Sequence, residues 1–590
     1  MIKVKKIERK FYALTLATIL ILVALGSAYA VTVSQWGNKQ TVSSGTMYYE
    51  GNYDFITGSH FNLSSKIWNS KGHVYNATGA NARIAINDLA NTTGEVYIPS
   101  MITLTDTLYV GEGCTLYGYG IGGFTQANNN NKTLLKNYNG KDDITIRGLR
   151  LEGNGINQPE WWTIASWTRF AYGIYFTGSD NVRIEDCFIN DSACGGILIY
   201  QGDNITIQNN KIWNSGKLYK DSGSALTQWQ ANHVYTYNCS NVLIENNDCF
   251  YSYACGIVVE GELSAPMAWR EYNWIVNGNT VIDTGYGYYF EDVRDGLCSD
   301  NIAYYCDDTQ VYGTAAGYRL APACTRVTLS GNKAYNCVYG YQNGASNITF
   351  NGCESYSSSN VGTGDFYNGG VLNKFYHCIS DDPASSGFYN DAGGYNVTFD
   401  GCYVYGGASY GVKISAWTLS RKAGYAIIEN CVFNDMTSYP ILCYGDNTTI
   451  KSNTITNSVY GMLLDTCKNT SIQNNNICDV SARAIRLTNV ERGIISGNFI
   501  NHVTDSGSHG IYLSACKNMS VFYNVIQGTG TNYPQYGVYE TGACHHNWIL
   551  LNKGIGVGTL VTLAAGSGSR VNASSTTTGT PDFDDWNWDI

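Results

Sequence analysis

A short phrase recurs along this 590-residue chain and constrains its fold more than any other feature. Residues 204–213 read NITIQNNKIW and residues 469–478 read NTSIQNNNIC. The shared pattern is an apolar residue, a spacer, an apolar residue, two mostly polar residues and then Asn or Cys, and most repeat intervals are 21 to 26 residues. The final position falls at Cys187, Asn210, Asn247, Asn279, Asn301, Asn332, Cys353, Cys378, Cys402, Cys431, Asn453, Asn475, Asn498, Asn524 and Asn552.

Each repeat holds three short β segments, and the pattern predicts an all-β solenoid. A Gly-led apolar run, such as Gly173-Ile-Tyr-Phe, opens about fourteen residues before the Asn or Cys; a Val-x-Ile run comes next, and a third run follows the Asn or Cys. Such segments cannot bury their faces alone, but stacked repeats can. We therefore predict a right-handed parallel β-helix of about 15 or more coils, on the order of 70 Å long at ~4.8 Å per strand. We expect the recurring Asn to adopt the left-handed backbone conformation and to form a side-chain ladder along the axis.

The first 30 residues have the order of a secretory signal peptide: a basic stretch, an apolar run and Ala28-Tyr29-Ala30. An uncleaved N-terminal anchor is the alternative. Cleavage after Ala30 changes the net charge from −11 to −15, and an acidic chain without a basic tract argues against nucleic acid as a partner. We expect an extracellular or cell-surface location, with no transmembrane segment in the mature chain. Acceptor sequences at Asn204 and Asn396 permit glycosylation, at a frequency close to chance.

The repeat resembles the pectate-lyase-like superfamily of right-handed parallel β-helices over roughly residues 80–560. The lead-in supports this likeness, because 81–90 can form a short N-terminal capping helix before the runs at 94–99, 108–113 and 115–118. The predicted domains are a signal peptide (1–30), a lead-in with helix and first strands (31–110), the β-helix (111–560) and an acidic and aromatic C-terminal tail or cap (561–590). No catalytic signature of the superfamily's lyases, polygalacturonases or epimerases occurs in the chain.

Nineteen cysteines is a high count, but their placement follows the repeat. Besides the five at the ladder position, five lie eight residues before it, where other repeats often carry Gly, Ala or Ser: Cys239, Cys324, Cys467, Cys516 and Cys544. Cys therefore behaves as a small buried residue. No zinc-like spacing is present, so we expect no metal site, whereas disulfides between neighbouring coils, for example Cys516 with Cys544, stay open.

The resemblance implies that a substrate would lie along the Gly-led strands, in a groove walled by loops. Long insertions at 156–170, 214–231, 307–316 and 261–273 cluster in the early repeats. Five Trp side chains in these loops, and two outward Tyr side chains on the strands, are candidates for contact with carbohydrate, although they can equally pack the loops onto the body. They are Trp161, Trp162, Trp167, Trp229, Trp269, Tyr235 and Tyr289.

Candidate catalytic groups lie at the ends of the same strands. Glu260 and Glu291 occupy equivalent positions in neighbouring repeats, with Asp292 and Arg319 close by. Carboxylates one strand apart raise one another's pKa and can act as the nucleophile and acid of a retaining glycosidase. They can also hold Ca²⁺ in a lyase-like site, with Arg319 as base or charge clamp. A surface of Glu–Arg salt bridges without catalytic function is the remaining alternative.

Two classes of function are left open. A non-enzymatic surface rod, with an envelope, sheath or adhesin-like role and contacts to polysaccharide, envelope components or further copies of itself, is favoured because the fold is long and regular while catalytic signatures are missing. The alternative is a polysaccharide lyase or glycoside hydrolase acting in the early-coil groove. No cofactor is expected, apart from Ca²⁺ in the lyase case.

Overall fold

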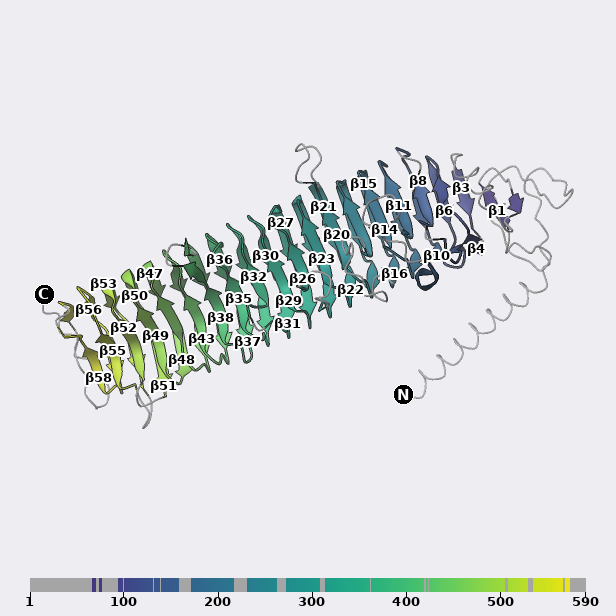
Figure 1. Cartoon of the computed structure of the whole chain (residues 1–590). Coiled ribbons are helices and arrows are strands. Elements are labelled where there is room, and N and C mark those ends of the chain that lie inside the picture. Colours follow the sequence, from purple (N-terminus) through teal and green to yellow (C-terminus); the bar gives the residue numbers. More distant parts are fainter. Residues whose placement is uncertain are drawn as a thin grey trace, which may run out of the picture.

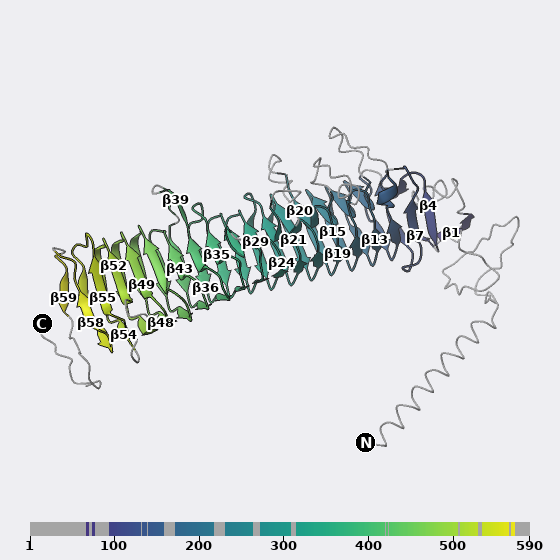
Figure 2. The same ribbon diagram turned by 60° about the horizontal axis from the view of Figure 1, so that its bottom comes forward.

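The computed structural model confirms the predicted all-β parallel solenoid. It describes residues 66–69, 74–76, 94–98, 100–130, 132–137, 140–158, 171–216, 231–262, 272–307, 314–360, 362–418, 421–422, 424–504, 508–528, 534–565 and 568–572. Three parallel sheets run the length of a rod, with β1 at one end and β58 and β59 at the other (Figures 1 and 2). The predicted signal peptide (1–30) and the expected capping helix at 81–90 lie outside the described residues.

Sheet I is built by the Val-x-Ile segments. Each strand pairs in parallel with its equivalent in the next coil, as Val182 does with Ile205, while β1 and β2 join at the N-terminal end in antiparallel pairing. Its strands are β1 (Lys66–Asn69), β2 (Val74–Asn76), β3 (Gly94–Tyr97), β6 (Cys114–Tyr117), β9 (Thr145–Arg147), β12 (Val182–Glu185), β15 (Asp203–Gln208), β18 (Ser240–Glu245), β21 (Tyr272–Asn277), β24 (Arg294–Ser299), β27 (Thr325–Ser330), β30 (Thr349–Asn351), β33 (Lys374–Tyr376), β36 (Val397–Asp400), β41 (Ala426–Glu429), β44 (Thr449–Lys451), β47 (Lys468–Gln473), β50 (Glu491–Ser496), β53 (Lys517–Phe522), β56 (Trp548–Leu550) and β59 (Arg570–Asn572).

Sheet II is built by the segments that follow the Asn or Cys. Its middle residues point inward, as Ile189 does against Ile212 of the next coil. Its strands are β4 (Met101–Leu104), β7 (Gly123–Gln126), β10 (Arg150–Glu152), β13 (Phe188–Asn190), β16 (Lys211–Trp213), β19 (Asp248–Phe250), β22 (Thr280–Ile282), β25 (Ile302–Tyr304), β28 (Lys333–Tyr335), β31 (Glu354–Tyr356), β34 (Ile379–Asp381), β37 (Tyr403–Tyr405), β42 (Val432–Asn434), β45 (Thr454–Thr456), β48 (Asn476–Val480), β51 (Phe499–Val503), β54 (Val525–Gln527) and β57 (Lys553–Ile555).

Sheet III is built by the Gly-led segments and carries the candidate site. A hairpin of β39 (Ala416–Thr418) and β40 (Arg421–Lys422) follows β38, and the 3-10 turn η2 (Gly155–Asn157) follows β10. The strands of sheet III are β5 (Leu108–Val110), β8 (Leu135–Asn137), β11 (Ile174–Thr177), β14 (Ile197–Tyr200), β17 (Val234–Tyr237), β20 (Cys255–Glu260), β23 (Tyr286–Glu291), β26 (Ala316–Leu320), β29 (Tyr339–Asn343), β32 (Phe366–Asn368), β35 (Ser386–Asn390), β38 (Tyr410–Ile414), β43 (Tyr439–Cys443), β46 (Met462–Asp465), β49 (Arg483–Thr488), β52 (His509–Ser514), β55 (Tyr536–Thr541) and β58 (Thr559–Thr562).

The glycine that opens many of these segments has a packing reason. A Cβ built on Gly287 would lie 2.6 Å from the carbonyl oxygen of Gly317, and one on Gly461 would lie 2.0 Å from that of Ala484. Both distances are shorter than a van der Waals contact. The backbone of the next coil therefore occupies the space that a side chain would need.

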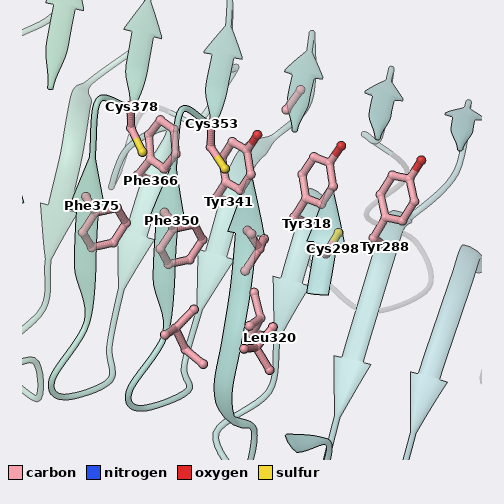
Figure 3. Packing of buried hydrophobic residues seen from close by; sticks show 14 of the residues in the cluster. Tyr288, Cys298, Tyr318, Leu320, Tyr341, Phe350, Cys353, Phe366, Phe375 and Cys378 are labelled. Atoms are coloured by element: carbon pink, nitrogen blue, oxygen red, sulfur yellow. The ribbon is translucent and has the colours of Figure 1, made fainter. Parts of the chain in front are cut away.

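The interior is filled by columns of identical side-chain types. Rings of Tyr288, Tyr318, Tyr341 and Phe366 stack in successive coils with centroids 4.5 to 4.8 Å apart (Figure 3). The buried hydroxyls do not stay unpaired, because Tyr318 donates a hydrogen bond to the carbonyl oxygen of the ladder residue Asn301 at 2.6 Å. Stacking at the strand spacing thus combines apolar burial with a satisfied polar group.

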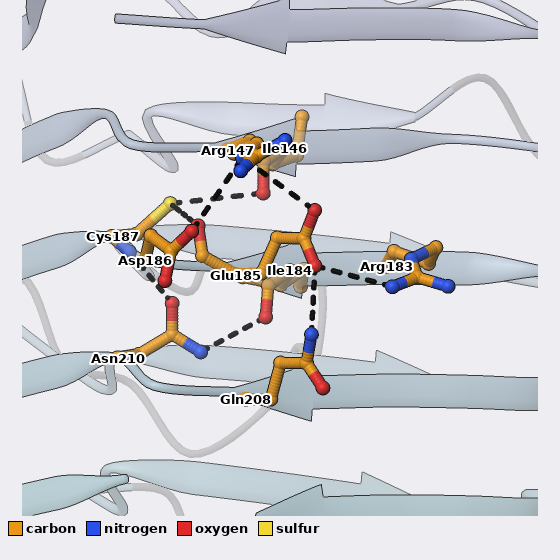
Figure 4. Close-up of polar contacts among 9 residues, drawn as sticks. All are labelled: Ile146, Arg147, Arg183, Ile184, Glu185, Asp186, Cys187, Gln208 and Asn210. Carbon is orange, nitrogen blue, oxygen red and sulfur yellow. Dashed lines mark hydrogen bonds and ion pairs between the residues drawn. The ribbon is translucent and has the colours of Figure 1, made fainter. Parts of the chain in front are cut away.

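The Asn ladder is present at the turn between sheets I and II. Asn247 donates its Nδ2 to Oδ1 of Asn279 at 2.9 Å and to the carbonyl of Ile207 at 2.9 Å, and it is fully buried. At the first ladder position Cys187 replaces Asn, and its N–H donates to Oδ1 of Asn210 at 2.9 Å (Figure 4). Each ladder amide therefore bonds to the backbone of the preceding coil and to the ladder side chain of the following coil.

One expectation about this turn is wrong. The left-handed residue is not the ladder Asn but the residue before it, as at Asn209 (φ 56°), Asn474 (φ 54°) and Gly497 (φ 66°). The side chain of the ladder residue points inward, and it contributes to the turn through its hydrogen bonds and not through its backbone conformation.

Candidate functional site

Two carboxylates end neighbouring strands of sheet III in the early coils. Glu260 closes β20 and Glu291 closes β23, and the two residues pair directly in the parallel register. Their backbones are therefore about one strand spacing, ~4.8 Å, apart. Tyr235 donates its hydroxyl to Glu260 Oε2 at 2.7 Å, and Tyr289 donates its hydroxyl to Glu291 Oε2 at 2.8 Å. Each carboxylate is thus oriented by one tyrosine of the same sheet face.

The environment of Glu260 favours its neutral form. Desolvation by burial raises its pKa to about 7, and the charges of Glu291 and Asp292 act in the same direction. The hydrogen bond from Tyr235 opposes this shift, because it stabilises the carboxylate. Asp292 itself is the left-handed turn residue (φ 54°) that directly follows Glu291. A protonated carboxyl beside a second carboxylate is the arrangement that supplies an acid and a base near neutral pH.

Arg319 interacts with neighbouring tyrosine and glutamine side chains and not with the two carboxylates. Its register partner is Tyr289, not Glu291, and its Nη1 donates to Tyr286 Oη at 2.9 Å and to Gln342 Oε1 at 2.6 Å. The guanidinium carbon also lies 5.1 Å from the centroid of the Tyr286 ring. Among the described residues no ion pair joins Arg319 to a carboxylate, so the alternative of a Glu–Arg salt bridge does not form at this arginine, and the catalytic roles of these residues stay predictions.

The tyrosines predicted to contact sugar are more enclosed than their outward direction suggests. Tyr235 and Tyr289 are 6% and 5% exposed and belong to a second apolar cluster on the outer side of sheet III. Their hydroxyls are used by the two glutamates, so their clearest role is to position these carboxylates. Contact of either ring with a sugar stays a prediction, and the five Trp candidates lie outside the described residues.

Sequence reasoning did not identify the residues that extend this surface. Tyr200 and Tyr237 precede Glu260 in the same row, and their rings stack at 5.1 Å with an interplanar angle of 7°. Glu262, two residues past Glu260, accepts a hydrogen bond from Asn238 at 3.2 Å. The signal was available in the sequence, because both tyrosines stand four residues after equivalent positions, Gly196 and His233, in their repeats.

The cysteines and the possibility of a metal site are two further features that the sequence raised. Each of the nineteen cysteines is a free thiol in the structure, and all except the half-buried Cys478 are buried. Cys516 and Cys544 are neighbours in successive coils, where the Cys516 N–H donates to the Cys544 sulfur at 3.4 Å. Within the described ranges no group of three or more His, Cys, Asp or Glu side chains is arranged to hold a metal ion. A Ca²⁺ requirement stays a prediction of the lyase alternative.

The solved structures that are similar to this chain share little sequence identity with it. Distant likeness is found to bacteriophage CBA120 tailspike protein 3 (14% identity, 62% of this chain and 59% of that one, TM-score 0.38) and to the pre-mature bacteriophage phi29 gene product 12 (14%, 81% and 64%, TM-score 0.37). The A-module of the Azotobacter vinelandii mannuronan C-5 epimerase AlgE4 is 13% identical over 83% of this chain and 94% of that one, with a TM-score of 0.23. The chain spans less than two thirds of the two phage proteins.

No curated protein matches the sequence. Among the described residues no helix has the length and hydrophobicity needed to cross a membrane. The family described as right handed beta helix region matches residues 137–304 and 418–554, together just over half of the chain. This match and the three-sheet solenoid show that the chain belongs to the right-handed β-helix family.

Proposed function

We propose that the protein is an exported surface rod that binds carbohydrate on the outer face of sheet III. The observation that carries the proposal is the paired carboxylates Glu260 and Glu291, which end adjacent strands and are oriented by tyrosine hydroxyls. Carboxylate oxygens and phenol groups on a firm β scaffold are suitable partners for sugar hydroxyls. The signal-like N-terminus supports export, and the regular solenoid supports a scaffold role in a cell envelope.

Binding can be tested on the full-length protein by affinity electrophoresis in a panel of neutral and acidic polysaccharides. Glu260→Gln and Glu291→Gln should each weaken retardation by about tenfold, because each removes a charge-assisted hydrogen bond. Glu245→Gln is the matched control, since Glu245 lies in the coil before that of Glu260 but faces outward from sheet I. Equal retardation of all variants, or none by any polysaccharide, would contradict the proposal.

A second candidate is glycoside hydrolysis with retention of configuration at the same pair. It is favoured by the pKa of Glu260, which burial raises to about 7 beside Glu291. Glu260 would serve as the acid and Glu291 as the nucleophile, whose separation in such enzymes is about 5 Å. New reducing ends should then appear in the polysaccharide panel, with a rate that falls above about pH 7 as Glu260 loses its proton. A lyase would instead release products that absorb ultraviolet light.

A further inference from the structure

A second cluster of polar side chains lies on the outer face of sheet III in the late coils, far from Glu260 along the rod. It comprises two arginines, a histidine and three tyrosines from three consecutive strands. Two register rows contain them: Arg483, His509 and Tyr536 in one, and Arg486, Tyr512 and Tyr539 in the other. The parallel pairing of β49, β52 and β55 thus gathers them into one patch, the late-coil patch.

The two guanidinium groups of this patch share one aromatic ring. The guanidinium carbons of Arg483 and Arg486 lie 4.5 and 5.9 Å from the centroid of Tyr512. Arg486 also donates from Nη1 to Tyr439 Oη at 3.3 Å. Cation–π contacts and one neutral hydroxyl orient two positive charges side by side without neutralising either of them.

Several ring and guanidinium nitrogens of the patch are buried without a hydrogen-bond partner. The Nε atoms of Arg483 and Arg486 and the Nδ1 atom of His509 have no hydrogen-bond partner, and His509 is only 8% exposed. Its ring is enclosed by Tyr536, Tyr512 and Tyr539, at centroid distances of 4.8 to 5.3 Å. An unpaired buried donor costs roughly 1–3 kcal/mol, so such a set is expected to have a partner in use.

No carboxylate of the described chain supplies that partner. Asp465 comes nearest in register on sheet III, where it pairs with Thr488, two residues past Arg486. It accepts a hydrogen bond from the hydroxyl of Thr466, and no ion pair links it to either arginine within the described residues. Two adjacent guanidinium groups with free planar donors match the geometry of an oxyanion.

We propose that the late-coil patch binds an oxyanion carried by a glycan, either a uronate carboxylate or a sulfate ester. A polymer fits better than a free ion because the row of Arg486 continues through Leu463 and Leu442 to Lys413, a further cation three strands away. At ~4.8 Å per strand the two cations are about 14 Å apart along the axis, so an extended acidic chain parallel to the rod can contact both.

The test uses the full-length protein and three probes: polygalacturonate, dextran sulfate and uncharged dextran. At low salt, one or both charged polymers should retard the protein in affinity electrophoresis, whereas dextran should not. Arg483→Ala and Arg486→Ala should each weaken this retardation by about tenfold or more, and Arg486→Lys by less, because lysine keeps the charge but loses the planar fork. Arg183→Ala, on the exposed face of sheet I, is the matched control and should behave as wild type.

The probes separate the two sources of the oxyanion. Retardation by polygalacturonate alone assigns the carboxylate, and retardation by dextran sulfate alone assigns the sulfate ester. A second readout is the pKa of His509 by NMR, which burial and Arg483 hold near 4 and which a bound oxyanion should raise while dextran leaves it unchanged.

The proposal is overturned if neither charged polymer binds, if single-stranded DNA binds equally well, or if both arginine variants behave like Arg183→Ala. Thermal unfolding of each variant shows whether a loss of binding reflects a loss of folding. Both arginine variants keep Glu260 and Glu291, so a neutral polysaccharide that retards the wild type at the early-coil site should still retard them, and the two proposals can fail separately.

Discussion

Replacing the ladder residue Asn475 by Leu tests whether the amide column stabilises the stack. The Asn475 Oδ1 atom accepts hydrogen bonds from the Asn453 N–H at 3.0 Å and from the Asn453 Nδ2 at 2.9 Å. Leu has a similar branched shape but no acceptor, so two donors of a buried residue lose their partner. At about 1–3 kcal/mol for each donor, the free energy of unfolding should fall by about 2–6 kcal/mol. No backbone strain adds to this cost, because the left-handed residue is Asn474.

The same change at Asn552 should cost less, although the local contacts are alike. Asn552 accepts hydrogen bonds from the Asn524 N–H at 3.1 Å and from the Asn524 Nδ2 at 2.9 Å, so two donors are again orphaned. Here, however, only β57 to β59 follow in the described chain, and the last coil can open to water without disturbing the rest. The loss is therefore limited by the cost of that local opening.

Denaturant unfolding measures the loss in global unfolding free energy, and native-state hydrogen exchange measures the free energy of local opening. Exchange at the Asn453 amide should accelerate strongly in Asn475→Leu, and changes in Asn552→Leu should stay within the last coils. Asn474→Gly is the control, because glycine accepts the left-handed conformation and Asn474 is exposed. Equal and negligible losses at both ladder sites would refute the reasoning, since the amides would then contribute nothing to stability.

Two further predictions concern the thiols and the acid of the early coils. Burial raises the pKa of Cys187 and of Cys324 to about 12, so a thiol reagent should label the native protein slowly. After denaturation without reductant, most of the nineteen thiols should react. Finding one or none of them free would instead indicate a rod cross-linked by disulfides. The pKa of Glu260 is raised to about 7, so its contribution to the free energy of unfolding is complete below about pH 4.5 and is lost as the pH rises through 7. Glu260→Gln should flatten the dependence of the unfolding free energy on pH in that window by up to about 3 kcal/mol. An unchanged pH dependence would contradict the raised pKa.

The fold was predictable because one spacing carries it. The strands of sheets I and II begin and end at a constant number of residues from the Asn or Cys, and this constant spacing sets the register between neighbouring coils. The position of the left-handed residue was misread because three repeats carry Asn twice in succession, at 209–210, 246–247 and 474–475. Gly278, Gly331 and Gly497 mark the correct position, since glycine stands immediately before the ladder Asn in those coils and has a positive φ.

The strand register of the candidate site could be predicted from the repeat, but the partners of its long side chains could not. Equivalent places in neighbouring repeats put Glu260 beside Glu291, and the structure keeps them there. Counting from the opening glycine likewise places Arg319 level with Tyr289, two residues short of the carboxylates. Which partner a long side chain then selects depends on groups 23 to 33 residues away in other coils, such as Gln342 and Tyr286. The repeat places Arg319 in the coil after Glu291 and so suggested an ion pair, whereas in the structure its Nη1 donates to a phenol and an amide, and only coordinates distinguish the two.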